Sequence, residues 1–193
     1  PDAPSVGFGI DENTAMVVEG DSAVVVGASG VVMVDARSAS GGGRAQSAGV
    51  GVSLASAGDV VDLRSFQIRR AAAKTEVSER DAPLQPPEDP FARWAFLHLV
   101  EELSATSASE ATFEFDGSTL QIIEAEGFSA AALEPTGGVE GTPRGLSAGP
   151  FLVRLTGGQG SDVRDRIDSL ALLAIETGPV AGLDAIVRQG EGR

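Results

Sequence analysis

Short runs of Val and Ile, separated by turn residues, fill the first third of the chain. Runs of this kind bounded by glycine-containing turns are typical of strands joined by hairpins. The pattern predicts strands over residues 5–11, 15–19, 23–26, 31–35, 50–54 and 60–63. The Gly58-Asp59 turn separates the last two strands, which we therefore expect to form a hairpin, and residues 38–49 are expected to be a Ser/Gly-rich loop.

The pattern changes at residue 69. The stretch RRAAAKTEVSERDAPLQPPEDP is charged and contains four prolines, so a linker is predicted over 69–90. Asp89 and Pro90 have the residue types of a helix N-cap and first turn, and apolar residues at helical spacing follow over 91–103. Beyond that helix the pattern predicts strands over 112–115, 120–124, 129–133 and 151–155 and a helix over 162–176.

These elements predict a chain in two parts. Residues 1–68 form the first part, residues 69–90 the linker, and residues 91–193 a small α+β domain of unknown role. A chain of 193 residues can bury one good core or two small ones.

The composition excludes several kinds of catalytic and binding site. With no Cys and a single His, the chain has no thiolate catalyst, no Cys-type zinc site and no His-based metal cluster, and no cofactor is expected. A net charge of -14 argues against nucleic acid as a partner, because phosphate binding requires Lys and Arg. The absence of an apolar run of about 18 residues argues against a membrane span.

The stretch GFGIDENTA at residues 7–15 is the candidate for chemistry. Its apolar left half runs straight into Asp11, Glu12 and Asn13. Polar residues at the end of a strand serve a solvated turn with an Asx contact, or they present a carboxylate at the rim of a sheet. From the residues alone both interpretations stay open.

Residues 6–37, VGFGIDENTAMVVEGDSAVVVGASGVVMVDAR, resemble the segment that follows the catalytic histidine in cyanophycinases and related serine peptidases of the peptidase E type. The shared features are a G-x-G-I-D-E-x-T-A block, then V-V-E-G-D, then the VVGASGV turn at residues 25–31 leading to V-D. The later SLASAGDVVDLRS is similar to the next hairpin of that family. The resemblance implies an α/β fold: the C-terminal part of a class I glutamine-amidotransferase-like sheet with β-hairpins, followed by the small α+β domain.

The resemblance also implies a function. In that family a Ser attacks, a His takes its proton and a Glu orients the His, and the matching block places that Glu at Glu12. Asp11 is then expected to be a structural acceptor in the same turn, and Thr14 a cap. The implied reaction is hydrolysis of a peptide or isopeptide bond, with a cyanophycin-type β-aspartyl-arginine polymer as a candidate substrate.

The same resemblance implies a partner. The Ser turn and the Asp-Gln-His block of the family would lie upstream of Pro1, so an N-terminal segment or a second chain is expected to bring Ser and His. The first residue is not Met, which suggests a processed or truncated piece. The central strands of the sheet would also lie upstream, so we expect a bare sheet edge covered in a homo- or hetero-oligomer.

Two further residues invite catalytic interpretations that the pattern does not favour. His98 lies on the predicted helix over 91–103 and is expected to form a surface pair with Glu102. Ser147 lies in GLSAG, but no helix is predicted to follow it as a nucleophile elbow requires. The alternative function is a non-catalytic structural or assembly module, or a degenerate homologue.

Overall fold

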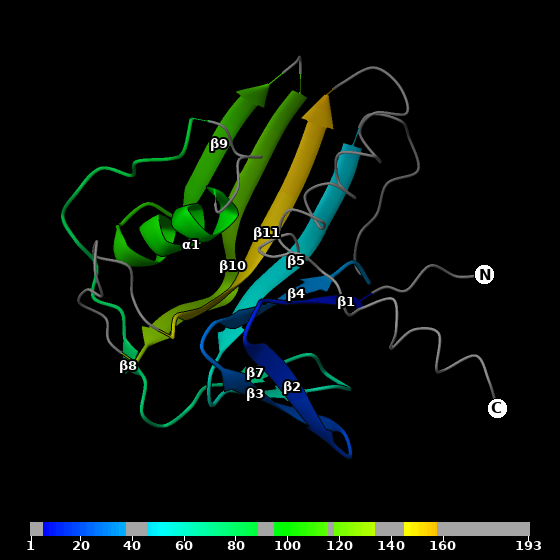
Figure 1. The fold of residues 1–193 in the computed structure, drawn as a ribbon. Coiled ribbons are helices and arrows are strands. Elements are labelled where there is room, and N and C mark those ends of the chain that lie inside the picture. The colour runs from blue at the N-terminus through cyan, green and yellow to red at the C-terminus, as the bar shows by residue number, and fades with distance from the viewer. Residues whose placement is uncertain (1–5, 38–45, 89–94, 116–117, 134–144, 158–193) are drawn as a thin grey trace.

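The computed structural model describes residues 6–37, 46–88, 95–115, 118–133 and 145–157 (Figure 1). Its elements are β1 (Val6–Ile10), β2 (Thr14–Glu19), β3 (Ser22–Gly27), β4 (Gly30–Asp35), β5 (Gln46–Ser56), β6 (Val60–Asp62), β7 (Ile68–Arg69), β8 (Thr75–Glu76), α1 (Ala95–Ala105), β9 (Glu110–Phe115), β10 (Ser118–Ala132) and β11 (Ser147–Gly157). The predicted cap at residues 89–90 and the predicted helix over 162–176 lie outside the described residues.

The strands form two antiparallel sheets. The larger sheet has seven strands in the order β1-β4-β5-β11-β10-β8, and β9 pairs with β10 as well. The smaller sheet has the order β2-β3-β6-β7 and lies across one end of the larger one (Figure 1). Within the described part of the chain, β1 and β2 are therefore both edge strands, on consecutive segments of the sequence.

The predicted α/β fold class is wrong. The described residues hold eleven strands and one helix, and every strand pair is antiparallel, whereas an α/β sheet needs parallel strands joined by helical crossovers. The C-terminal strands do not build a separate α+β unit either, because β11 pairs with β5 over most of its length. Local turn signals identify strands, but they do not say which distant strand each will pair with.

Most of the predicted strands are present, and two local predictions need correction. The strands expected over 120–124 and 129–133 are one strand, β10, whose pairing with β11 shifts register between Glu124 and Ser129. The hairpin expected at Gly58-Asp59 does not form, because β5 continues in the larger sheet and β6 in the smaller one. The turn instead bonds to β3: Gly58 N–H donates to the carbonyl of Val25 at 2.8 Å.

β4 explains how one strand can be apolar along its whole length. Val31 and Met33 point into a core between the two sheets, together with Val25 and Val61. Val32, on the opposite face, belongs to a second core. A strand buried on both faces has a continuous apolar sequence rather than an alternating one, which is the pattern of GVVMVD.

Helix α1 covers the second core. Leu99, Val100 and Leu103 are buried there with Phe113 of β9 and Leu120 of β10. The spacing of these helix residues is the apolar stripe expected of a helix packed on a sheet. No helix among the described residues is long and apolar enough to cross a membrane.

His98 lies on the outer side of α1. Its side chain is 64% exposed, and its Nδ1 lies 3.6 Å from Oε2 of Glu101. The surface interpretation of His98 is therefore confirmed, but its partner is Glu101 rather than Glu102. Glu102 instead accepts from Arg80 at 2.9 Å.

Candidate functional site

The Asp11–Asn13 turn directly follows the edge strand β1. Asp11 Oδ1 accepts the backbone N–H of Glu12 at 2.8 Å, and its Oδ2 accepts the hydroxyl of Ser29. The backbone carbonyl of Asp11 accepts the N–H of Thr14 at 3.2 Å. The prediction that Asp11 is a structural acceptor is confirmed, and its bonds fix the path of the backbone on both sides of Glu12.

A second motif of the sequence holds this turn from the other side. Thr14 Oγ1 accepts the N–H of Ser29 at 3.0 Å, so Thr14 caps the turn before β4. Gly27 packs on the backbone of Asn13: a Cβ at Gly27 would lie 2.1 Å from the Asn13 carbonyl oxygen, and φ of Gly27 is +126°. Only glycine fits there. The acidic turn and the VVGASGV turn are therefore one structural unit.

Glu12 lies at the exposed tip of this unit. Its side chain is exposed, and among the described residues its carboxylate accepts no hydrogen bond and forms no ion pair. His98 is not near enough to be its partner, since α1 packs on β9 at one margin of the larger sheet whereas β1 forms the opposite margin (Figure 1). The structure thus places the predicted acid on a rigid support and leaves its carboxylate free to contact another group.

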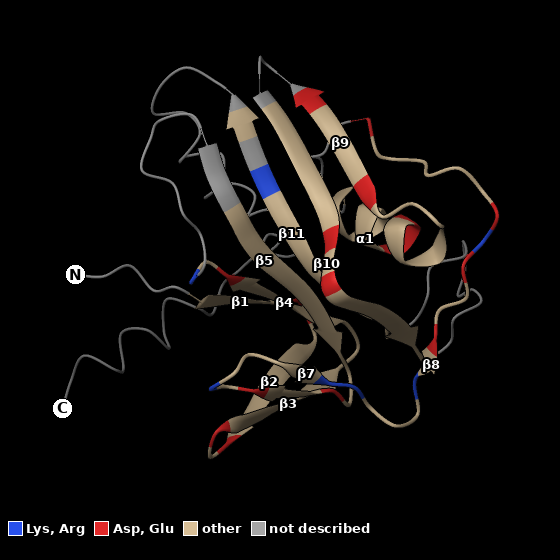
Figure 2. Cartoon of the chain, turned by 180° about the vertical axis from the view of Figure 1, so that it is seen from behind, with Lys and Arg blue, Asp and Glu red and all other residues tan. Residues whose placement is uncertain are grey.

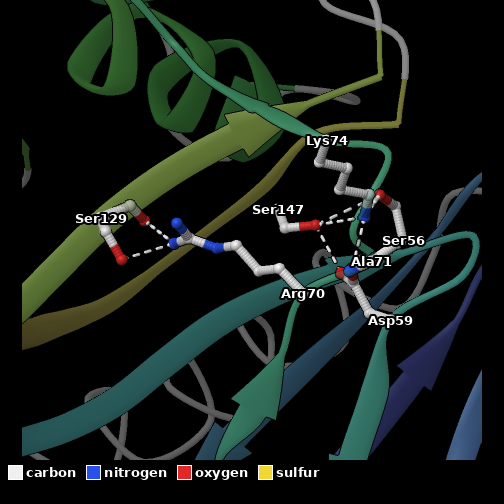
Figure 3. A network of polar contacts seen from close by, with 7 residues as sticks. All are labelled: Ser56, Asp59, Arg70, Ala71, Lys74, Ser129 and Ser147. Carbon is white, nitrogen blue, oxygen red and sulfur yellow. Dashed lines mark hydrogen bonds and ion pairs between the residues drawn. The ribbon is translucent and has the colours of Figure 1, made fainter.

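A buried polar cluster, missed at the level of sequence, joins four side chains: Ser56, Asp59, Lys74 and Ser147 (Figure 3). We call it the Asp59 cluster. The side chains of Asp59 and Lys74 are 0% exposed, and their charged groups, Oδ1 and Nζ, are 2.6 Å apart. Lys74 Nζ also donates to Ser56 Oγ at 2.8 Å and to Ser147 Oγ at 2.5 Å, so all three ammonium donors have acceptors.

Both carboxylate oxygens of Asp59 also have their hydrogen-bond donors. Oδ1 accepts the N–H of Ala71 at 2.9 Å in addition to Lys74, and Oδ2 accepts the N–H of Ser56 at 2.9 Å and the hydroxyl of Ser147. These bonds connect the end of β5, the segment before β8 and the start of β11. A fully bonded buried ion pair of this kind holds distant segments in one arrangement.

The Asp59 cluster contains the residue types of a Ser–Lys nucleophile, but its geometry does not suit catalysis. Burial lowers the pKa of Lys74, and the hydrogen bond and negative charge of Asp59 oppose that shift. A general base must be free to accept the proton of the serine, whereas Lys74 already donates to three oxygens. Ser147 is 1% exposed. Strand β11, and no helix, follows it, which agrees with the sequence-based rejection of GLSAG as a nucleophile elbow.

A pocket of about 500 Å³ adjoins the cluster, between β7 with its preceding loop and the irregular part of β10. We call it the Arg70 pocket. Both apolar and polar residues line this pocket, chiefly Ser53, Leu54, Phe66, Arg70, Ser129 and Pro150. The Arg70 side chain reaches across to β10, where Nη2 donates to Ser129 Oγ at 2.6 Å and to the Ser129 carbonyl (Figure 3).

The sequence carries little signal for either site. Asp59 lies in a predicted hairpin turn, and Lys74 and Arg70 lie in the predicted linker. Lys74 lies in a charged stretch poor in large apolar residues, and a Lys in such a stretch is ordinarily solvated, so the sequence does not indicate that it is buried. The described residues hold no group of three or more His, Cys, Asp or Glu able to bind a metal ion.

Comparisons of the chain with protein-family models, with curated proteins and with solved structures found no match.

Proposed function

We propose that this chain is the acid-supplying, C-terminal portion of a cyanophycinase-like serine hydrolase. A segment or second chain that carries Ser and His would complete it along β1. The observation that carries the proposal is the position of Glu12: exposed, on a turn held by Asp11 and Gly27, at the end of an edge strand. The resemblance of GFGIDENTA and its neighbouring blocks to that family supports the same role.

The surface around the turn supports the proposal that another segment or chain binds there. Strand β1 has a partner on only one side among the described strands, and unpaired strand edges tend to pair. On one face of the adjacent β2–β3 hairpin, Val17 is 54% exposed, and Val24, its partner in the ladder, and Val26 are 36% and 41% exposed. Away from its acidic tip this hairpin carries no charged residue (Figure 2). An uncharged surface of this kind is typical of an interface.

In the proposed enzyme, Glu12 has an orienting role. The serine hydroxyl attacks the carbonyl carbon of a peptide or isopeptide bond, and the histidine takes the hydroxyl proton and returns it to the leaving amine. Water then hydrolyses the acyl-enzyme. The Glu12 carboxylate would accept the other ring N–H of the histidine, which fixes its tautomer and stabilises the imidazolium. A β-aspartyl-arginine polymer is the proposed substrate class.

A second candidate function is a non-catalytic assembly module. Val17, Val24 and Val26, which share one face of the β2–β3 hairpin, favour it equally well, because such a patch serves an assembly contact without any catalytic role. The two candidates differ in whether the partner brings a serine nucleophile.

The first prediction separates these candidates. The purified chain alone is expected to hydrolyse neither cyanophycin nor an activated ester, because a carboxylate without Ser and His has no nucleophile to activate. Material purified from its natural source is expected to contain a second polypeptide, or a longer chain, that reacts with a serine-directed fluorophosphonate probe. Intact mass and a labelled gel provide the measurement. Inhibitor-sensitive turnover by the chain alone, or natural material without a labelled serine, would contradict the hydrolase proposal.

The second prediction concerns assembly. The purified chain is expected to form oligomers with a solution mass well above its 19.6 kDa, because the unpaired edge of β1 and the exposed valines of the β2–β3 hairpin can pair with another copy. Val17→Lys is expected to lower that mass by placing a charge in the interface. Thr112→Lys, at an exposed position of β9, is the matched control and is expected to leave the mass unchanged. Sedimentation measures all three, and a monodisperse monomer for the parent chain would count against the exposed surface as an interface.

A further inference from the structure

The Arg70 pocket has the dimensions of a small-molecule site. Its volume of about 500 Å³ falls inside the range of roughly 300–1,000 Å³ typical of ligand pockets. Leu54, Phe66 and Pro150 supply apolar wall, and Ser53 and Ser129 supply hydroxyl groups. Ligand sites usually have this composition: a mainly apolar lining with a few polar groups that set orientation.

Arg70 supplies the charge of this pocket. The guanidinium has five N–H donors, and the described residues account for only Nη2, which donates to Ser129. No carboxylate among the described residues forms an ion pair with it. The nearby Asp59 is already saturated by Lys74, Ser147 and two backbone N–H groups. Arg70 therefore has donors to spare in a half-buried position.

The half-buried guanidinium of Arg70 is the group that would attract an anion, and the surrounding charges decide how strongly. Burial lowers the pKa of the Arg70 guanidinium, and the negative charges of Asp59 and Glu76 oppose that shift without contacting it. The positive charge of Lys74 is matched by Asp59, so it does not change the balance in the pocket. Among the described residues, Glu126 is the one acid that lines the pocket; it is exposed, and it weakens the attraction for anions.

We propose that the Arg70 pocket binds a small organic carboxylate. Nε and Nη1 of the guanidinium are left to donate to a carboxylate oxygen, and the apolar part of the ligand would lie against Phe66, Leu54 and Pro150. This inference stands apart from the hydrolase proposal, because it uses none of the residues around Glu12.

Benzoate is a suitable probe, because it joins a carboxylate to an apolar ring. Amide NMR of the ¹⁵N-labelled chain is expected to show saturable benzoate-induced shifts at Ser53 and Ser129. Benzamide, which has the same shape without the charge, and inorganic phosphate, which has charge without an apolar body, are expected to bind at least roughly tenfold more weakly, the size of one charge-assisted hydrogen bond.

The variants assign the effect to Arg70. Arg70→Gln is expected to weaken benzoate binding by roughly tenfold or more, and Arg70→Lys by less, because lysine keeps the charge but has fewer donors. Arg69→Gln is the matched control, since it removes the same charge from an exposed neighbour. Glu126→Gln is expected to strengthen binding. The amide spectrum of each variant reports whether it is folded. If Arg70→Gln does not fold, Arg70→Lys is used in its place to test the role of Arg70.

Three outcomes would overturn the proposal. They are the absence of saturable benzoate shifts in the pocket, equal losses for Arg69→Gln and Arg70→Gln, and phosphate or benzamide binding as tightly as benzoate.

Discussion

Glu12→Gln is expected to slow turnover of the completed enzyme by roughly 10²–10⁴-fold, by analogy with other triads in which the orienting acid is amidated. The amide would no longer hold the histidine in the tautomer that accepts the serine proton, nor stabilise the imidazolium. Because the Glu12 side chain is exposed and has no partner among the described residues, its replacement should leave folding and substrate binding unchanged. The measurement is kcat and KM of the enzyme assembled from this chain and the Ser/His-bearing segment.

Two controls make this result specific. Asp11→Asn is expected to lower the free energy of unfolding by roughly 1 kcal/mol, the value of a hydrogen bond, with little change in kcat. Glu19→Gln removes an exposed carboxylate at the end of β2 and is expected to change neither. If Glu12→Gln turned over within a few-fold of the parent but melted at a lower temperature, the turn would be structural and the catalytic role of Glu12 wrong.

The largest effect on stability is expected at the Asp59 cluster. Lys74→Met is expected to lower the free energy of unfolding by about 3–5 kcal/mol, because it leaves the Asp59 carboxylate buried without its counter-charge. Methionine approximates the length of the lysine stem, so the loss reports the charge and its three hydrogen bonds more than a cavity. Urea unfolding followed by circular dichroism measures it.

An exposed ion pair serves as the matched control. Arg64 and Asp21 have side chains 78% and 57% exposed and lie 2.5 Å apart, so Arg64→Met is expected to change the free energy of unfolding by less than about 1 kcal/mol. The double variant Asp59→Asn/Lys74→Met is expected to be more stable than the sum of its single variants predicts, because it leaves no unpaired charge. A Lys74→Met effect as small as that of Arg64→Met would show that Asp59 does not depend on this ammonium group.

The sequence by itself determined the local elements of this protein. Strands β1 to β4 and the β2–β3 hairpin follow from apolar runs and the Gly20-Asp21 turn, because two strands joined by a short turn have few other partners. The pairing of β9 with β10 across residues 116–117 follows in the same way. The structural role of Asp11 could also be predicted, since an Asp at a strand end accepts backbone N–H groups within its own turn.

The tertiary structure alone decided the long-range partners. Nothing local requires β5 to pair with β11, about a hundred residues away, and this pairing replaces the expected α/β arrangement with one antiparallel sheet. The same pairing brings Ser147 to Asp59 and Lys74, which lie 88 and 73 residues before it. Long-range pairs depend on the packing of whole sheets, and a buried Lys has the same local sequence signal as a solvated one. The Arg70 pocket and the Asp59 cluster therefore became visible only once the sheets were in place.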